Sequence, residues 1–218
     1  MRRPKRIGFS LMKLLDSQKM KRQKIDPFIQ KAVETVSTVY LKTIVNRIAV
    51  PRHYIAEASN NRHVRDQIFK ELQSLGYTVF LQGNHDNIIA HFGPFKANQP
   101  VLLIGAHYDS VPFSPGADDN ASAVAALLAC ARGIALQDHR YPVCFVAFNR
   151  EEERFKGSWE FVRTGLAENE ITVTEAHIFE MVGYCGDQKV PSGLPIRLPK
   201  KGDFIGILGN RRSNHLIR

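Results

Sequence analysis

Six side chains that could together bind a metal ion follow apolar segments of this 218-residue sequence. One is an imidazole and five are carboxylates, and zinc and other borderline or hard divalent cations prefer this set of nitrogen and oxygen donors. Without a cation, so many carboxylates beside an apolar core would repel one another at a considerable cost in free energy. The residues are His107, Asp109, Asp118, Glu151, Glu152 and Glu180.

The spacing of these residues assigns them different tasks. His107 and Asp109 share one face of a strand, so Asp109 can orient the imidazole while the other ring nitrogen faces a metal. Asp118 lies in a glycine-containing turn before a helix and could bridge two metals with its two oxygens. Glu151 and Glu152 are adjacent in a loop and point in different directions, so Glu152 can ligate while Glu151 serves as a base for water.

Each motif by itself has a simpler explanation. A His-x-Asp sequence is usually a satisfied core or surface histidine, ADDN is usually a turn with a helix cap, and three consecutive glutamates usually start a solvated helix. The metal-site interpretation therefore depends on the motifs meeting at one place in the fold.

The order of the expected elements brings the motifs together. Apolar or β-branched runs bounded by Gly, Asn or Pro predict strands, and the amphipathic or alanine-rich stretches between them predict helices. This alternation predicts an α/β fold with helices on both sides of a mainly parallel sheet, which places functional residues at the carboxyl ends of the strands. We expect strands in 77–82, 87–93, 100–108, 143–148, 176–184 and 203–209, and helices in 26–49, 60–77, 120–136 and 158–164.

The composition is that of a globular chain, and its net charge of +9 is concentrated at one end. Residues 1–25 hold nine basic side chains and one acidic one. We therefore expect 1–25 to be a basic, disordered leader and 26–218 to be one folded domain. No nucleic-acid partner is expected, because Phe9 is the only aromatic residue in the leader that bases could stack on.

We expect no targeting signal for the secretory pathway and no membrane-spanning segment in this sequence. The apolar run 7–12 is interrupted by Lys13 and no small-residue cleavage site follows, so we expect no signal peptide, while a mitochondrial-type presequence stays an alternative. No stretch reaches the length of a membrane span, and a cytoplasmic protein is the default expectation. Cys130, Cys144 and Cys185 lack metal-like spacing and are expected to be buried thiols. The oligomeric state is not indicated.

Four motifs in sequence, GAHYDS, PGADDNAS, FNREEERFKGS and FEMVGY, make the chain resemble a known enzyme family. It is similar to the di-zinc aminopeptidases, the twenty-eighth metallopeptidase family, whose relatives include glutamate carboxypeptidases and glutaminyl cyclases. The resemblance runs from Thr43 to the end. It implies a three-layer α/β/α domain with a mixed, largely parallel sheet, of which 26–218 would be the N-terminal part, incomplete at its C-terminus.

The resemblance also implies roles for single residues. His107 would ligate one zinc, Asp118 would bridge two zincs, and Glu152 would ligate the second. Glu151 would be the general base. The peptide bond between Asp118 and Asp119 would be cis, as in relatives.

Two departures from the family pattern concern its remaining ligands. Most relatives have an aspartate where this sequence has Glu180, which carries the same charge on one more methylene, and we expect it to ligate; the alternative is a glutamate paired with a neighbouring base. The family's last ligand is a histidine further downstream than Arg218, and none of His139, His177 and His215 matches its position. We therefore expect fewer zinc ions here than the two of an intact family domain.

The function implied by the resemblance is zinc-dependent hydrolysis of the N-terminal peptide bond of a peptide with a free amino terminus. This chain could also be an inactive piece of such an enzyme. One alternative is a glutaminyl cyclase or carboxypeptidase-like relative on the same scaffold, and another is a non-catalytic binding module.

Overall fold

The computed structural model describes residues 9–16, 27–93, 100–137, 142–189 and 201–213. The chain divides into two compact units. The larger unit comprises residues 26–183, and the smaller one combines residues 1–25 with 184–218.

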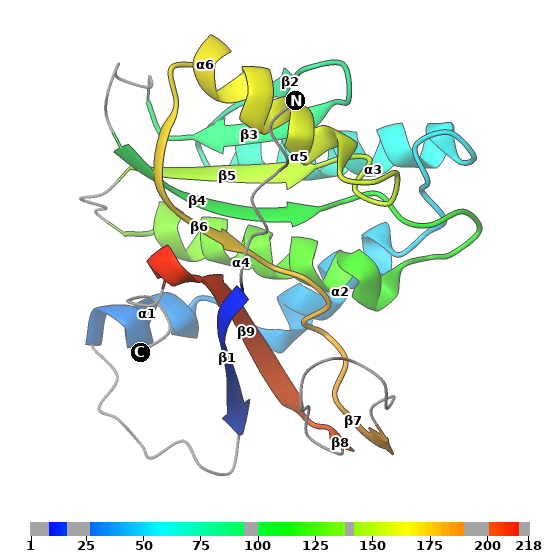
Figure 1. Cartoon of the computed structure of the whole chain (residues 1–218), viewed down its shortest axis with the longest axis vertical. Helices are drawn as coiled ribbons and strands as arrows, with labels where there is room; N and C mark the ends of the chain where they lie inside the picture. The colour runs from blue at the N-terminus through cyan, green and yellow to red at the C-terminus, as the bar shows by residue number, and fades with distance from the viewer. Residues whose placement is uncertain (1–8, 17–26, 94–99, 138–141, 190–200, 214–218) are drawn as a thin grey trace. The chain divides into compact units, whose positions relative to one another are not determined.

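The larger unit is built on a five-stranded sheet with the strand order β2–β3–β5–β4–β6 (Figure 1). The pairs β2–β3 and β3–β5 are antiparallel, whereas β5–β4 and β4–β6 are parallel, so only β3 runs against the other four strands. This is the mixed, largely parallel sheet that was predicted. The strands are β2 (Thr78–Gln82), β3 (Asn87–His91), β4 (Pro100–His107), β5 (Val143–Phe148) and β6 (Thr172–Ile178).

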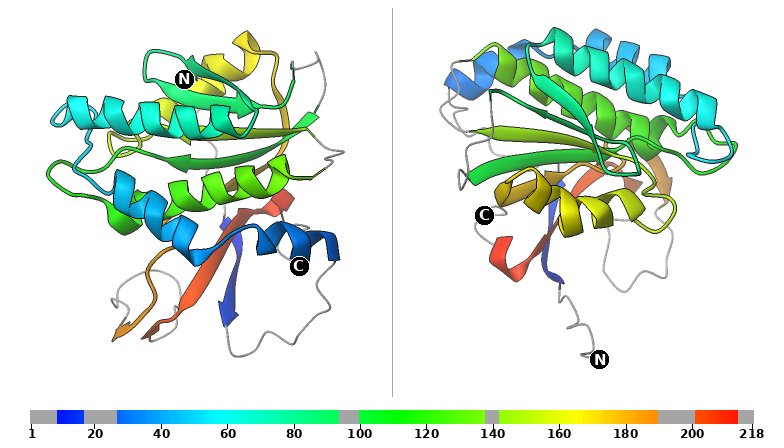
Figure 2. Two further views of the ribbon diagram at one scale, coloured as in Figure 1. Left: turned by 180° about the vertical axis from the view of Figure 1, so that it is seen from behind. Right: turned by 90° about the horizontal axis from the view of Figure 1, so that it is seen from above.

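Helices cover both faces of this sheet and complete three layers (Figure 2). Helices α2, α3 and α4 pack on one face, and the run α5–η2–α6 packs on the other. The helices of this unit are α1 (Pro27–Glu34), α2 (Thr38–Ile48), α3 (Ala58–Ser74), the π-helical turn η1 (Ala117–Ser122), α4 (Ala123–Ala135), α5 (Lys156–Glu160), the π-helical turn η2 (Phe161–Gly165) and α6 (Leu166–Glu168).

The central strand β5 takes part in a separate hydrophobic core on each face. Phe145 and Ala147 belong to the core beneath α2, α3 and α4, whereas Val146 and Phe148 belong to the core beneath η2 and α6. A strand covered on both faces needs apolar residues throughout, which is why VCFVAF shows no alternation with polar residues. Burying each large apolar side chain stabilises the fold by roughly 1.5–3 kcal/mol. The two cores therefore fix the strands, and with them the strand ends that carry the polar motifs.

Element boundaries differ from the sequence prediction in several places. The strand expected over 176–184 is β6 (Thr172–Ile178), so Glu180 lies beyond its end, and the helix expected over 158–164 is the longer run α5–η2–α6. The segment expected to form one helix over 26–49 is divided into α1 and α2, because the Ser37 side chain accepts a hydrogen bond from the Tyr40 backbone N–H and caps a new helix. The expected cap, Asp26, lies outside the described residues. Helix α3 begins at Ala58, before the asparagines that were expected to cap it.

The smaller unit contains two antiparallel strand pairs. Part of the predicted disordered leader, residues 9–16, forms strand β1 and pairs with β9. Five of these eight residues are apolar, and the pairing satisfies backbone groups that would otherwise need water. The elements are β1 (Phe9–Asp16), β7 (Gly186–Lys189), β8 (Lys201–Gly202), β9 (Phe204–Asn210) and the 3-10 turn η3 (Arg211–Ser213).

The three cysteines are free thiols in different surroundings. Cys144 is buried as predicted, Cys130 is partly buried, and Cys185 is exposed, so the prediction of a buried thiol is wrong for Cys185. None of the helices in the described ranges has both the length and the apolar character that crossing a membrane requires.

Candidate metal centre

Three adjacent parallel strands end at the same edge of the sheet and bring the predicted motifs together. In the strand register, His107 at the end of β4 lies opposite Phe148 at the end of β5, and Gly105 lies opposite Ile178 at the end of β6. The glutamates 151 and 152 follow β5 closely, and Glu180 follows β6. Parallel pairing therefore carries residues that are far apart in the sequence to one place.

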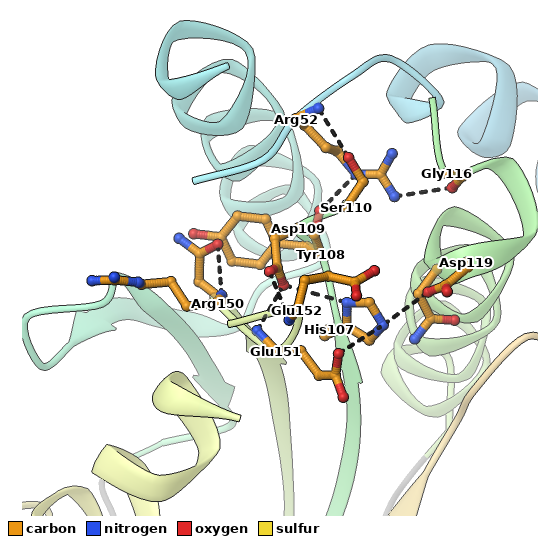
Figure 3. Close-up of polar contacts among 12 residues, drawn as sticks. Arg52, His107, Tyr108, Asp109, Ser110, Gly116, Asp119, Arg150, Glu151 and Glu152 are labelled. Atoms are coloured by element: carbon orange, nitrogen blue, oxygen red, sulfur yellow. Dashed lines mark hydrogen bonds and ion pairs between the residues drawn. The ribbon is translucent and has the colours of Figure 1, made fainter. Parts of the chain in front are cut away.

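His107 is the buried centre of this cluster, with 3% of its side chain exposed (Figure 3). Its Nδ1 lies 3.3 Å from Asp109 Oδ1. Its Nε2 lies 3.2 Å from Asp119 Oδ1 and 3.5 Å from Glu180 Oε2. Glu151 Oε2 is 4.0 Å from the same nitrogen. One ring nitrogen is thus held by a buried carboxylate, and the other faces several carboxylates.

Two sets of three side chains could each hold a metal ion. The first set is His107, Asp119 and Glu180, and the second is His107, Glu151 and Glu152. In each set the donor atoms all lie within 4.8 Å of one another. Three protein donors with a position left for water are what catalytic zinc sites use.

Asp109 is completely buried and connects the histidine to the acidic loop. Its Oδ1 accepts a hydrogen bond from the Glu151 backbone N–H at 3.1 Å, and its Oδ2 accepts one from the Glu152 N–H at 3.2 Å. The carboxylate that faces His107 therefore also fixes the backbone of the two glutamates.

The turn before α4 brings Asp119, and not Asp118, to the imidazole. Asp118 Oδ1 instead accepts a hydrogen bond from the Gly183 backbone N–H at 2.8 Å. The two aspartates are neighbours of one chemical type, and the backbone decides between them, because Asp119 leaves the helical conformation at φ −100° and ψ 92°. The cis peptide bond is Asp119–Asn120, one residue later than predicted.

Sequence reasoning missed a buried arginine behind the cluster. Arg52 has no exposed surface and donates four side-chain hydrogen bonds, all to backbone carbonyls. Two go to Tyr108 at 2.6 Å and Gly116 at 3.0 Å, on either side of the loop between β4 and η1 (Figure 3). The others go to Val50 and Pro115. No recognisable motif surrounds Arg52, so the sequence held no signal for this role.

Three buried asparagines extend this support to the loop after β5. The side chains of Asn61 and Asn149 hydrogen-bond each other at 3.0 and 3.1 Å. Asn61 also donates to the Arg52 carbonyl, and the Asn149 backbone N–H donates to Asn87 Oδ1. The asparagine that directly follows β5 was a usable signal, since a polar residue at a buried strand end needs partners.

The electrostatics of the cluster favour a cation. Burial alone would lower the pKa of His107, but its hydrogen bonds to Asp109, Asp119 and Glu180 raise that pKa to about 12. Burial, followed by the negative charge of Asp119, raises the pKa of Glu152 to about 7. The raised pKa values mean that the site binds protons more readily than isolated side chains would. A bound cation would likewise reduce the repulsion between the neighbouring carboxylates.

The carboxylates of Glu152 and Glu180 are not paired with a lysine or arginine among the described residues, which leaves them available to a divalent ion. Glu152 Oε1 is buried and has no hydrogen-bond partner among the described residues. In the same part of the chain, the side-chain partners of Glu180 are His107 and Asn120, and neither is a lysine or arginine. His177, on β6, is exposed, and the other two histidines considered from the sequence, 139 and 215, lie outside the described residues.

Comparison with known proteins identifies the family. The model of Peptidase family M28 matches residues 87–196, which include every residue of the cluster. The chain belongs to peptidase family M28. Its relatives include the protein YfbL of Escherichia coli K12, itself uncharacterised, with 36% identity over 152 residues, or 62% of this chain and 46% of YfbL. Aminopeptidase YwaD of Bacillus subtilis is also 36% identical, over 112 residues that make up 50% of this chain and 24% of YwaD. This M28 chain thus spans half or less of the length of these two relatives.

Solved structures support the same fold. A structure of LapA of Legionella pneumophila, which is described as an aminopeptidase, superposes with a TM-score of 0.66 at 18% identity, over 74% of this chain and 49% of LapA. The glutaminyl cyclase of Porphyromonas gingivalis superposes with a TM-score of 0.58 at 27% identity, over 72% of this M28 chain and 63% of the cyclase.

Replacing Arg52 with methionine is expected to destabilise the protein by about 3–5 kcal/mol, because buried carbonyls lose their donors and the acidic cluster loses a compensating charge. Arg47→Met is the control. Arg47 is partly exposed and paired with Glu71, so its loss should cost less than about 1 kcal/mol. Urea unfolding measures both variants, and an equal loss for the two would contradict the role given to Arg52.

Glu152→Gln is expected to raise the melting temperature at pH 8 in the presence of a chelator. A carboxyl group whose pKa is raised on folding opposes folding once pH exceeds its usual value of 4.5, so removing its charge stabilises the folded chain. The gain should vanish near pH 4, where both states bind the proton.

Glu153→Gln is the matched control, with the opposite sign expected. Its hydrogen bond to Arg150 lowers the pKa of Glu153 to about 2, so its charge stabilises the fold above pH 4.5. Thermal unfolding at the two pH values measures both variants, and a loss of melting temperature for Glu152→Gln at pH 8 would contradict this electrostatic picture.

Proposed function

We propose that the chain carries the catalytic site of a zinc-dependent aminopeptidase, an exopeptidase that hydrolyses the N-terminal peptide bond of a peptide. The convergence of Asp119 and Glu180 on His107 Nε2, with Glu151 alongside, carries this proposal. Membership of peptidase family M28 and the similarity to aminopeptidase YwaD support it.

Particular residues would hold the metal. His107, Asp119 and Glu180 supply one set of three donors, and Glu152, whose buried Oε1 has no hydrogen-bond partner among the described residues, would offer a further carboxylate oxygen to a metal. Bound zinc supplies Lewis acidity, which lowers the pKa of a water molecule and polarises a carbonyl group. Asp109, hydrogen-bonded to His107 Nδ1, holds the ring so that Nε2 faces the carboxylates.

Glu151 would transfer the proton. It would accept a proton from the attacking water and donate it to the leaving amine, as a general base and then a general acid. Burial raises the pKa of Glu151, which brings it nearer to neutral pH, where a group can both accept and release a proton. The hydrogen bond from its backbone N–H to Asp109 fixes the start of its side chain relative to His107.

The charge of the site supports a substrate with a free amino terminus. Five carboxylates surround one histidine, so the free ammonium group of a peptide N-terminus would be attracted to them. Half of the Glu180 side chain is exposed, which leaves a carboxylate at the solvent side of the cluster.

A glutaminyl cyclase is the second candidate function, because the Porphyromonas gingivalis cyclase shares 27% identity with the chain and a large part of its fold. The substrates separate the two candidates. An aminopeptidase releases the first residue of aminoacyl chromogenic substrates, whereas a cyclase would convert peptides that begin with glutamine. A chain that binds zinc and turns over neither substrate would be a binding module.

Glu151→Gln is expected to lower zinc-dependent turnover of aminoacyl substrates by about 10²–10⁴-fold while zinc stays bound, because this proposal assigns proton transfer to Glu151 and metal binding to His107, Asp119 and Glu180. Glu152→Gln is expected instead to weaken zinc binding. Glu153→Gln, whose side chain pairs with Arg150, is the control and should preserve both properties.

Hydrolysis of an aminoacyl chromogenic substrate and zinc titration by calorimetry measure the two properties separately. Loss of zinc in Glu151→Gln together with its retention in Glu152→Gln would contradict the assignment. Absence of any zinc-dependent turnover of the unaltered chain would contradict the proposed activity.

A further inference from the structure

Glu180 is a candidate ligand that lies beyond the end of its strand. It follows β6, which pairs with β4 alone among the described strands and ends at Ile178. Half of its side chain is exposed. Something other than strand pairing must therefore hold Glu180 against the buried His107.

The segment after Glu180 is bound by the turn η1, which also carries Asp119. Three consecutive backbone N–H groups, those of residues 181–183, donate to three side chains of the turn. Met181 donates to Asn120 Oδ1 at 3.0 Å, and Val182 donates to Ser122 Oγ at 3.0 Å. The third bond, at 2.8 Å, runs from Gly183 to Asp118 Oδ1.

Asn120 also reaches the ligand directly. It is completely buried, and its amide nitrogen donates to Glu180 Oε2 at 3.2 Å and to the Phe179 carbonyl at 3.3 Å. One side chain thus binds the carboxylate of Glu180 and the backbone on both sides of it.

Gly183 permits the close approach of the segment to the turn. A Cβ atom at this position would lie 2.6 Å from Ser122 Cβ and 3.2 Å from Asp118 Oδ1. Any larger residue would have to push the segment away from the turn, and the hydrogen bonds to the turn would lengthen.

We propose that Asp118, Asn120 and Ser122 form a clamp that positions Glu180 beside Asp119 and His107. Asp119 lies between two of the clamp residues, so the turn η1 supplies one candidate ligand and fixes another. Asp118 is then a positioning residue and not a metal ligand. The inference rests on the proposed function for the presence of a metal, and on the hydrogen bonds above for the clamp itself.

Two substitutions of Asp118 isolate the clamp. Asp118→Asn and Asp118→Ala remove the same charge, but only asparagine keeps an oxygen that can accept the Gly183 N–H. We expect the full-length Asp118→Ala chain to bind zinc about 10–100-fold more weakly than Asp118→Asn, the effect of losing a residue that orients a ligand. Competition with a chromophoric chelator measures the affinities.

The neighbouring aspartate supplies the matched comparison. Asp119→Asn removes a candidate ligand and should bind zinc far more weakly than Asp118→Asn. If Asp118 were the ligand, Asp118→Asn and Asp118→Ala would lose zinc equally, and Asp119→Asn would retain it, which would overturn the inference.

Gly183→Ala tests the clamp from the other side of the contact, in the segment that follows Glu180. We expect it to weaken zinc binding and to shift the visible absorption bands of bound Co²⁺, since these bands report the geometry of the ligands. Melting temperatures in the presence of a chelator identify a purely structural effect. Variants with lowered melting temperatures but the zinc affinity and Co²⁺ spectrum of the unaltered chain would overturn the inference.

Failure of the clamp and failure of the proposed function have different signatures. If the unaltered chain binds no zinc, both the proposed function and the proposal that the clamp positions a zinc ligand are overturned. An unaltered chain that binds zinc, with Asp118→Ala and Asp118→Asn of equal affinity, overturns the clamp alone.

Discussion

The convergence of carboxylates on one buried imidazole is the constraint on which the rest of the larger unit depends. The acidic groups within reach of His107 cannot all ionise in a partly buried site without positive charge nearby. The fold provides some of that charge through the imidazole itself and through Arg52. Burial lowers the pKa of Arg52 to about 10, which is still high enough for the guanidinium to stay protonated at neutral pH. We propose that a divalent cation provides the remainder, and the two donor sets around His107 fit such an ion.

Neighbouring acidic residues take different tasks because the backbone sends them in different directions. Glu152 has a buried oxygen without a partner among the described residues, whereas Glu153, next in sequence, is paired with Arg150. Asp118 and Asp119 are divided in the same way, one bonded to the backbone after Glu180 and one beside His107. The type of residue alone therefore does not tell which carboxylate faces the histidine. The hydrogen-bond partners of each carboxylate decide this.

The sequence was sufficient for features that depend on local pattern. Apolar runs located four strands of the sheet, whereas the fifth was expected over 176–184 and is β6 over Thr172–Ile178. The rule that parallel strands end at one edge placed His107 close to the glutamates. It was not sufficient where long-range contacts decide. The choice between two adjacent aspartates follows from the non-helical backbone of η1, and the position of Arg52 depends on carbonyls more than 50 residues away. Strand β1 depends on pairing with β9, near the other end of the chain, which no pattern within residues 1–25 reveals.

We propose that this edge of the sheet is a zinc site built on His107, Asp119 and Glu180. A crystal structure of the zinc-loaded chain tests it most directly. The account predicts an ion bonded to His107 Nε2 and to carboxylate oxygens of Asp119 and Glu180, each at about 2.0–2.2 Å. An ion held by Asp118 or by His107 Nδ1, or zinc bound only elsewhere on the chain, would contradict it.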